Sequence, residues 1–168
     1  MHRVLLLLAA LAVGCSGISA NYDYDTDADF SRLRQYSWHT RKDEGELTDI
    51  DRKRIREAAA AELGARGFAF NETAPDFRVA MHGGTKTRVR VTDSGYRYGP
   101  GPWWGGHGVD VYQYEEGTLI LDVVDAKSNE LIWRGTATGV VNPNATPEQK
   151  EKQIREAVTK MLANFPPK

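Results

Sequence analysis

Four aromatic residues in a glycine- and proline-rich stretch are the side chains best suited to molecular recognition. They are Tyr96, Tyr98, Trp103 and Trp104. Exposed Tyr and Trp side chains stack on sugar rings, anchor at membrane interfaces and form the energetic centres of protein interfaces. Long irregular loops are uncommon unless they are functional or disordered, so we predict that these four residues bind a partner. The alternative is a hairpin tip that folds its Trp side chains back onto a sheet.

A row of basic side chains is the second candidate site. Arg78, Lys86, Arg88 and Arg90 follow the two-residue period of β-strands and would project from one face. Such a row suits contact with an anionic surface, for example lipid phosphates or an anionic glycan. The alternative is the solvated outer face of a sheet, because the opposite face of the same strands must pack inward.

Residues that carry catalysis or bind metals are present but do not form recognisable motifs. His39, His82 and His107 are far apart, and the adjacent Glu115 and Glu116 would point to opposite faces of a strand. The sequence contains no His-x-x-x-His, Gly-x-Ser-x-Gly or Gly-Lys-Ser/Thr motif. We therefore expect no enzymatic activity, no metal site and no cofactor. An envelope hydrolase is the alternative, which a deep pocket with convergent titratable groups would support.

The N-terminus has the composition of a secretory signal peptide. A basic start at Arg3 is followed by an apolar run over residues 4–13. A signal-peptide core has about 7 to 15 apolar residues after a basic start, whereas a membrane-spanning helix needs about 20. We therefore expect that residues 1–14 are a signal peptide and that the protein is exported.

Cys15, the single cysteine of the chain, lies directly after this signal. The segment from Leu11 to Ser16 resembles the bacterial lipobox, in which the Cys is diacylated and becomes the mature N-terminus. Lipidation would also remove the oxidation liability of an unpaired thiol in an exported protein. The alternative is an ordinary signal peptide in which Cys15 happens to lie near the cleavage site.

A lipid on Cys15 would fix the address of the protein. In Gram-negative lipoproteins Asp after the Cys usually causes retention in the inner membrane, so Ser16 implies the outer membrane, with the domain facing the periplasm. In a host with a single membrane, the same anchor implies its outer face. Residues 15–21 form a short tether of about 20 Å, and we expect a single domain over residues 22–168.

The composition fits this address and excludes one class of partner. The 22 Lys and Arg residues balance 23 Asp and Glu residues, for a formal net charge of −1. Nucleic-acid recognition needs a concentrated excess of basic residues, so we expect no nucleic-acid partner. Hydrophobic residues at 40% and charged residues at 27% are typical of a globular domain.

Two helices are predicted from capping signals and apolar spacing. The first begins at Thr48 or Asp49 and ends at Gly67. The second begins at Thr146, with Gln149 completing a capping box. Their apolar faces repeat every three or four residues: Ile55, Ala59 and Leu63 in the first, and Ile154, Val158, Met161, Leu162 and Phe165 in the second.

Alternating apolar residues predict strands over 21–25 and 34–39, and two hairpins. The first hairpin joins 77–81 to 87–91 around Gly83-Gly84, and the second joins 118–124 to 131–138. Asp122 and Arg134 are placed to pair across the second hairpin. Hairpins separated by a helix favour an α+β domain, with an antiparallel β-sheet of hairpins and two α-helices packed on one face. We expect these residues of the second hairpin to share inward faces: Leu119, Leu121, Val123, Leu131, Trp133 and Ala137.

Five short segments in this order and spacing carry a family resemblance. They are Tyr22-Asp23-Tyr24-Asp25, Ala28-Asp29-Phe30-Ser31, Tyr36-Ser37-Trp38, Tyr114-Glu115-Glu116-Gly117-Thr118-Leu119 and Trp133-Arg134-Gly135. Together they are similar to the domain of unknown function 4136 family of bacterial envelope lipoproteins, over nearly all of the mature chain. The resemblance implies an envelope address and brings no established reaction or catalytic residue.

These observations lead to two functional hypotheses. The first is a non-enzymatic outer-membrane lipoprotein whose periplasmic domain binds an envelope protein or glycan through the aromatic loop. The second is a scaffold at the membrane surface whose aromatic loop contacts lipid. In both cases the lipid anchor on Cys15 holds the protein at the membrane.

Overall fold

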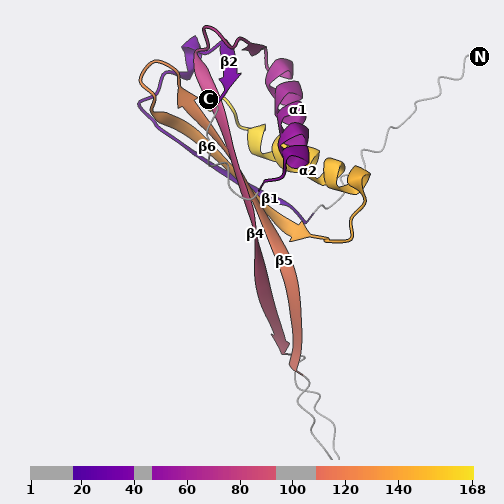
Figure 1. Ribbon diagram of the computed structural model, residues 1–168. Helices are drawn as coiled ribbons and strands as arrows, with labels where there is room; N and C mark the ends of the chain where they lie inside the picture. The colour runs from indigo at the N-terminus through magenta and orange to yellow at the C-terminus, as the bar shows by residue number, and fades with distance from the viewer. Residues whose placement is uncertain (1–16, 40–46, 94–108) are drawn as a thin grey trace, which may run out of the picture.

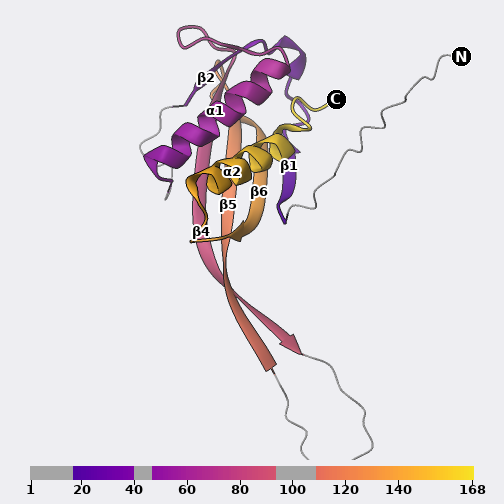
Figure 2. The ribbon, with the colours of Figure 1, turned by 90° about the vertical axis from the view of Figure 1, so that its right-hand side faces the viewer.

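In the computed structural model, residues 17–39, 47–93 and 109–168 are described, with residues 89–93 and 109–112 described by their backbone alone. They form a six-stranded sheet in the order β1-β6-β5-β4-β2-β3, with two helices on one face (Figures 1 and 2). The elements are β1 (Ser19–Tyr24), the 3-10 helix η1 (Phe30–Arg32), β2 (Gln35–Trp38), α1 (Asp49–Ala65), β3 (Ala69–Phe70), β4 (Phe77–Asp93), β5 (Val109–Asp125), β6 (Leu131–Val141) and α2 (Pro147–Leu162).

The expected α+β architecture with two helices on one face is confirmed. Strands β1, β6, β5 and β4 pair antiparallel, whereas β2 runs parallel to both β3 and β4. A parallel pair needs a long crossover connection, and α1 provides it because it lies between β2 and β3 in the chain. The sheet is therefore mixed at one edge and is not built from hairpins alone.

Both predicted helix starts are confirmed. The Thr48 hydroxyl accepts a hydrogen bond from the Asp51 backbone N–H at the start of α1. Thr146 and Gln149 form the reciprocal capping box at the start of α2. Past the end of α1, Gly67 has φ +86, the left-handed conformation that glycine adopts without strain. These local signals fix where each helix begins and where α1 ends.

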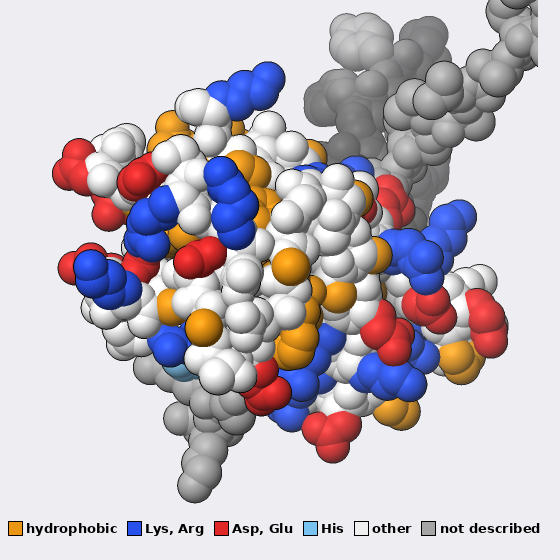
Figure 3. Space-filling view, turned by 90° about the horizontal axis from the view of Figure 1, so that it is seen from above, with side chains coloured by type: hydrophobic (Ala, Val, Ile, Leu, Met, Phe, Trp, Pro, Cys, Tyr) orange, Lys and Arg blue, Asp and Glu red, His pale blue; other side chains and the backbone are white. Residues whose placement is uncertain are grey.

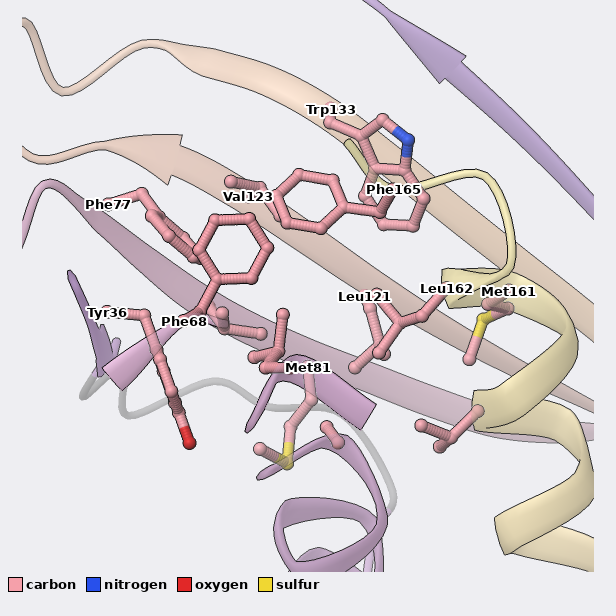
Figure 4. Packing of buried hydrophobic residues seen from close by; sticks show 14 of the residues in the cluster. Tyr36, Phe68, Phe77, Met81, Leu121, Val123, Trp133, Met161, Leu162 and Phe165 are labelled. Atoms are coloured by element: carbon pink, nitrogen blue, oxygen red, sulfur yellow. The ribbon is translucent and has the colours of Figure 1, made fainter. Parts of the chain in front are cut away.

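The core lies between the helices and the sheet and is centred on aromatic rings. Trp133 of β6, Phe77 of β4 and Phe165, which follows α2, are almost completely buried. The ring of Phe165 lies 5.2 Å from Trp133, 5.5 Å from Phe68 and 5.8 Å from Phe77, centroid to centroid (Figure 4). The chain after α2 thus closes the core.

The predicted hairpin around Gly83-Gly84 is wrong, because β4 is one continuous strand from Phe77 to Asp93. The dipeptide is a common turn signal, yet the two-residue alternation continues unbroken through it. A Cβ on Gly83 would collide with the side chain of Leu47, so the glycine allows that side chain to pack on the strand. The partner of β4 is β5, which pairs with it along its whole length.

The second hairpin is confirmed, with one correction to its inward face. Trp133 and Ala137 lie opposite Val123 and Leu119 as expected. A β-bulge between Val123 and Val124 shifts the register, so Leu131 is 45% exposed while Ile132 is buried. The two-residue alternation of a regular strand, applied from Trp133, could not predict the additional residue of the bulge.

The strand predicted over residues 21–25 is present as β1, but its aromatic side chains are only partly covered. Tyr22 and Tyr24 are 45% and 37% exposed, because β1 is an edge strand of the sheet. Their rings stack on each other at 6.3 Å, and Tyr24 contacts Phe30 edge-on at 6.0 Å.

The outer parts of β4 and β5 extend beyond the rest of the sheet as a two-stranded projection (Figures 1 and 2). The third strand, β6, ends at Val141 opposite Glu115. From the pair Arg88 and Tyr114 to the pair Asp93 and Val109, β4 and β5 pair with each other alone among the strands that the structure describes. We call residues 88–93 and 109–114 the arm.

Candidate binding surface

The face of the sheet away from the helices carries the predicted basic row. Because β4 is continuous, Arg78, Lys86, Arg88 and Arg90 all occupy alternate positions of one strand and share this face. Arg78 is half-buried, whereas Lys86 and Arg88 are exposed. The position of Arg90 is given by register alone, opposite Tyr112. The basic residues are thus on one strand and one face. They extend into the arm from the rest of the domain, which we call the body.

Acidic and carbonyl oxygens partner part of this row. The Arg88 guanidinium donates to the Glu116 carboxylate, with the Nη2–Oε1 distance at 3.0 Å. Arg78 Nη1 donates to the Ala126 carbonyl at 3.3 Å. Exposed ion pairs of this kind contribute about 0 to 1 kcal/mol. The row therefore keeps most of its capacity to contact an anionic partner, with Lys86 and Arg88 both exposed.

Three polar residues form a cluster on the same face, farther from the arm than Lys86 and Arg88. Arg134 donates two hydrogen bonds to the nearly buried Asp122 carboxylate, Nε to Oδ1 at 2.6 Å and Nη2 to Oδ2 at 2.7 Å. The hydrogen bond to Asp122 raises the pKa of Arg134 above its already high ordinary value. His82 Nε2 lies 3.4 Å from Asp122 Oδ2. The predicted pairing of Asp122 with Arg134 is confirmed, and it fastens β5 to β6.

Asp125 is a buried carboxylate that the sequence analysis did not single out. It forms an ion pair with Arg32 and accepts hydrogen bonds from the backbone N–H groups of Lys127 and Ser128 at 2.8 and 2.9 Å. An Asp at the first position of a turn, followed by polar residues, is the available sequence signal. Its partners are the turn and η1, so its role is structural.

The remaining predicted site residues lie outside the part of the chain that the structure describes. They are Cys15, Tyr96, Tyr98, Trp103 and Trp104. In the described ranges, no group of three or more His, Cys, Asp or Glu side chains is arranged to hold a metal ion. None of the described helices is long and apolar enough to cross a membrane.

The tether and the arm emerge from the same end of the sheet. Ser19 begins β1 opposite Thr138, and Thr138 in turn lies opposite Thr118 of β5. The arm begins a few residues beyond Thr118 along the same strand. The opposite end of the body, seen in Figure 3, has Lys and Arg side chains interspersed with Asp and Glu. The start of β1 and the base of the arm therefore lie at the same end of the sheet.

The fold and this surface define an α+β domain with an extended sheet face and a projecting two-stranded arm. The chain belongs to the DUF4136 family, described as a domain of unknown function, whose model matches residues 20–167. This confirms the family expected from the sequence. Among curated proteins, none matches the chain.

Two solved structures share the fold. A PDZ domain protein from Parabacteroides distasonis ATCC 8503 is 14% identical, with a TM-score of 0.58 over 91% of this chain and 37% of that chain. A dodecamer of a PelC variant from Paraburkholderia phytofirmans is 10% identical, with a TM-score of 0.50 over 87% of this chain and 95% of that chain. This chain thus spans well under half of the first protein's length. At these identities the similarity defines the fold alone.

Proposed function

We propose that this protein is a non-enzymatic, lipid-anchored envelope lipoprotein that binds an envelope protein or glycan through its arm. The observation that supports the proposal is the two-stranded construction of the arm. A lone two-stranded hairpin is at best marginally stable in water, and a third strand or a packed surface is what normally completes it. Among the strands that the structure describes, no third strand pairs with the arm from Arg88 to Asp93.

The arm offers two means of recognition to such a partner. Both outer edges of its strands carry backbone N–H and C=O groups that another extended chain can pair with. The uncovered face adds the cations Lys86 and Arg88 at its base, and the tip between the two strands contains Trp103 and Trp104. The proposed partner is therefore one with an extended segment or anionic groups.

The anchor completes the proposal. Acylation of Cys15 would hold the domain at the periplasmic face of the outer membrane through a tether of about 14 Å, shorter than expected from the sequence because β1 begins at Ser19. Two acyl chains give stable attachment where one gives marginal binding. The lipid would thus determine the location, and the arm would determine the partner.

A specific observation favours a second candidate, contact of the arm with the membrane surface itself. The arm and the start of β1 lie at one end of the sheet. At roughly 3.3 Å per residue the arm extends about 20 Å beyond the body, which is farther than the roughly 14 Å that the chain can span between Cys15 and the start of β1 at Ser19. Tip residues such as Trp103 and Trp104 suit a membrane interface.

In-cell photocrosslinking from position 88 distinguishes these functions. We expect a photoreactive residue in place of Arg88 to yield one discrete protein or glycan adduct. The matched control is the same residue in place of Lys53, which is exposed on α1, on the face of the sheet opposite the basic row. The control should not give that adduct. Lipid adducts alone from position 88 would support the second function, and identical adducts from both positions would contradict a role for the arm.

A further inference from the structure

A cavity of about 270 Å³ lies between the two helices and the sheet, near the base of the arm. Its walls come from the first turns of α1, the first half of α2 and the strands β4, β5 and β6. Figure 2 shows both helices crossing the same face of these strands. None of the side chains assigned above to the basic row or the arm lines it, so it is separate from the proposed binding surface.

Most of the cavity wall is aliphatic. Ile55, Ala137 and Ala157 are buried in it, and Leu119 and Ile154 are half-buried beside them. Polar side chains complete the lining, namely Asp51, Thr85, Thr118, Thr138, Asn142, Lys150 and Gln153. Among the described lining residues none is aromatic, unlike the core around Phe165. A mainly apolar wall with a few polar groups suits a ligand with a hydrocarbon part and a polar end.

Glycines on neighbouring strands keep this space open. A Cβ on Gly117 would lie 2.7 Å from Val141 Cγ2, and a Cβ on Gly139 would lie 3.1 Å from Ile18 Cγ1. Both glycines line the cavity with Val141 and Ile18. Larger residues at 117 and 139 would push these aliphatic side chains out of place, so the wall depends on the absence of side chains at these two positions.

The rim of the cavity has a single uncompensated cation. Lys150 is exposed in the first turns of α2 and has no ion pair among the residues that the structure describes. The one acidic residue of the lining, Asp51, is paired with Arg54 at 3.0 Å and accepts a hydrogen bond from the Thr48 hydroxyl at 2.8 Å. Among the described lining residues, Lys150 is therefore the one charged group left for a ligand.

We propose that this cavity binds a diffusible single-chain amphiphile of the fatty-acid class, with the hydrocarbon inside and the carboxylate at Lys150. The volume supports a medium-length chain. Taking about 30 Å³ for each group of water size, the cavity holds roughly nine such groups. Longer chains would extend through the open rim.

Isothermal titration calorimetry with decanoate tests the proposal, using the full chain with Cys15→Ser so that no acyl group is attached. Affinity should rise about tenfold for each two methylenes from hexanoate to decanoate, the increment expected for burial of hydrocarbon. The rise should end near decanoate as the cavity fills. Decan-1-ol should bind more weakly than decanoate, and decyltrimethylammonium more weakly still.

Variants separate the wall from the rim. Ala157→Leu fills the cavity and should reduce decanoate affinity at least tenfold, and Ala137→Val provides a second filling variant if the first unfolds. Lys150→Gln should reduce decanoate affinity three- to tenfold and leave decan-1-ol unchanged. Lys152→Gln is the matched control, because Lys152 is also exposed on α2 but does not line the cavity.

Three results would overturn the proposal. One is equal binding of decanoate and decyltrimethylammonium, which indicates adsorption to the surface. Another is unchanged decanoate affinity in a folded filling variant. The third is binding by the Cys15→Ser chain but not by the acylated protein in lipid nanodiscs, which would assign the cavity to the protein's own acyl chain. Crosslinking from position 88 does not depend on any of these results.

Discussion

A single glycine determines how closely the helix α2 packs on the core of this protein. A Cβ on Gly135 of β6 would collide with the ring of Trp133 and lie 3.2 Å from Met161 Cβ of α2. Gly135 therefore allows the indole to lie flat against its own strand beneath the helix. In the sequence this residue is noticeable only as part of the Trp133-Arg134-Gly135 segment. The structure shows that a glycine is needed there for a steric reason.

We predict that Gly135→Ala destabilises the protein by about 1 to 3 kcal/mol, the range for overpacking a filled core. Gly64→Ala is the matched control, because a Cβ there meets no neighbour and the residue lies within α1. It should stabilise the protein by about 0.5 to 1 kcal/mol. Urea unfolding followed by circular dichroism measures both, and equal effects of the same sign would contradict the steric account.

Phe165 is the side chain whose removal should weaken the core most directly. It lies beyond α2 and contacts aromatic residues from β4, β6 and the segment after α1. We predict that Phe165→Ala lowers the free energy of unfolding by about 3 to 5 kcal/mol. Phe70→Ala, at a ring that is 54% exposed, should cost much less. Thermal unfolding of the two variants measures this difference, and an equal loss of stability in Phe70→Ala would contradict the central role of Phe165.

At the scale of elements, one acidic side chain connects the two helices. Glu62 of α1 accepts hydrogen bonds from Arg66 Nη1 at 2.5 Å and from the Thr159 hydroxyl of α2 at 2.7 Å. Burial raises the pKa of Glu62, but the hydrogen bonds from Arg66 and Thr159 and the charge of Arg66 outweigh it, so its pKa lies below the ordinary value. The ionised form is thus the one that holds α1 to α2.

This lowered pKa predicts the direction of a pH effect. A carboxyl whose pKa is lower in the folded state contributes stability above its unfolded pKa and loses it as the pH falls through the folded pKa. Between pH 7 and pH 3, wild-type protein should therefore lose more stability than Glu62→Gln. Urea midpoints at the two pH values measure this difference, and equal losses would show that ionised Glu62 contributes nothing.

The sequence predicted helices better than strand pairing, for a physical reason. Caps at Thr48 and Thr146 are local hydrogen-bonding patterns that can be read within one turn. The parallel pairing of β2 with β4 depends on contacts between distant segments, which no local pattern encodes. The Gly83-Gly84 dipeptide was misread because the same residues serve a turn and a close approach.

Of the two candidate sites, one could be predicted from local sequence and the other could not. The basic row was predictable because alternation alone places its members on one face of β4. The cavity was not, because its open space arises only when β4, β5 and β6 align their small residues under α1 and α2. The only advance signal was a scatter of glycines at 84, 117 and 139, whose alignment depends on the register.

On the scale of the whole molecule, we expect the body to fold without the arm. Among the residues whose side chains the structure describes, the hydrophobic core cluster lies outside the arm. Replacing residues 88–114 by Asn-Gly, a dipeptide that closes two-residue hairpins, would join the paired residues Thr87 and Glu115. We predict that this variant unfolds within about 1 kcal/mol of the parent, because the lost ion pairs are exposed.

The same variant should retain decanoate binding and lose the crosslinked partner of the arm. Denaturant unfolding, calorimetry and co-purification from envelope fractions measure the three properties in parallel. An unfolded product would show that the arm contributes to the body. Retention of the partner by a folded product would move the interaction to the helices or to the opposite end of the sheet.

Strand β4 runs without interruption from Phe77 in the aromatic core to Asp93 at the end of the arm, a length of roughly 55 Å at 3.3 Å per residue. The arm is consequently an extension of the strand that α1 and α2 pack against, with no joint between them. Tension applied to its tip would run along the hydrogen-bonded ladder of β4 and β5 and reach the helix interface directly. The arm and the helix-covered part of the sheet are thus one continuous pair of strands, β4 and β5.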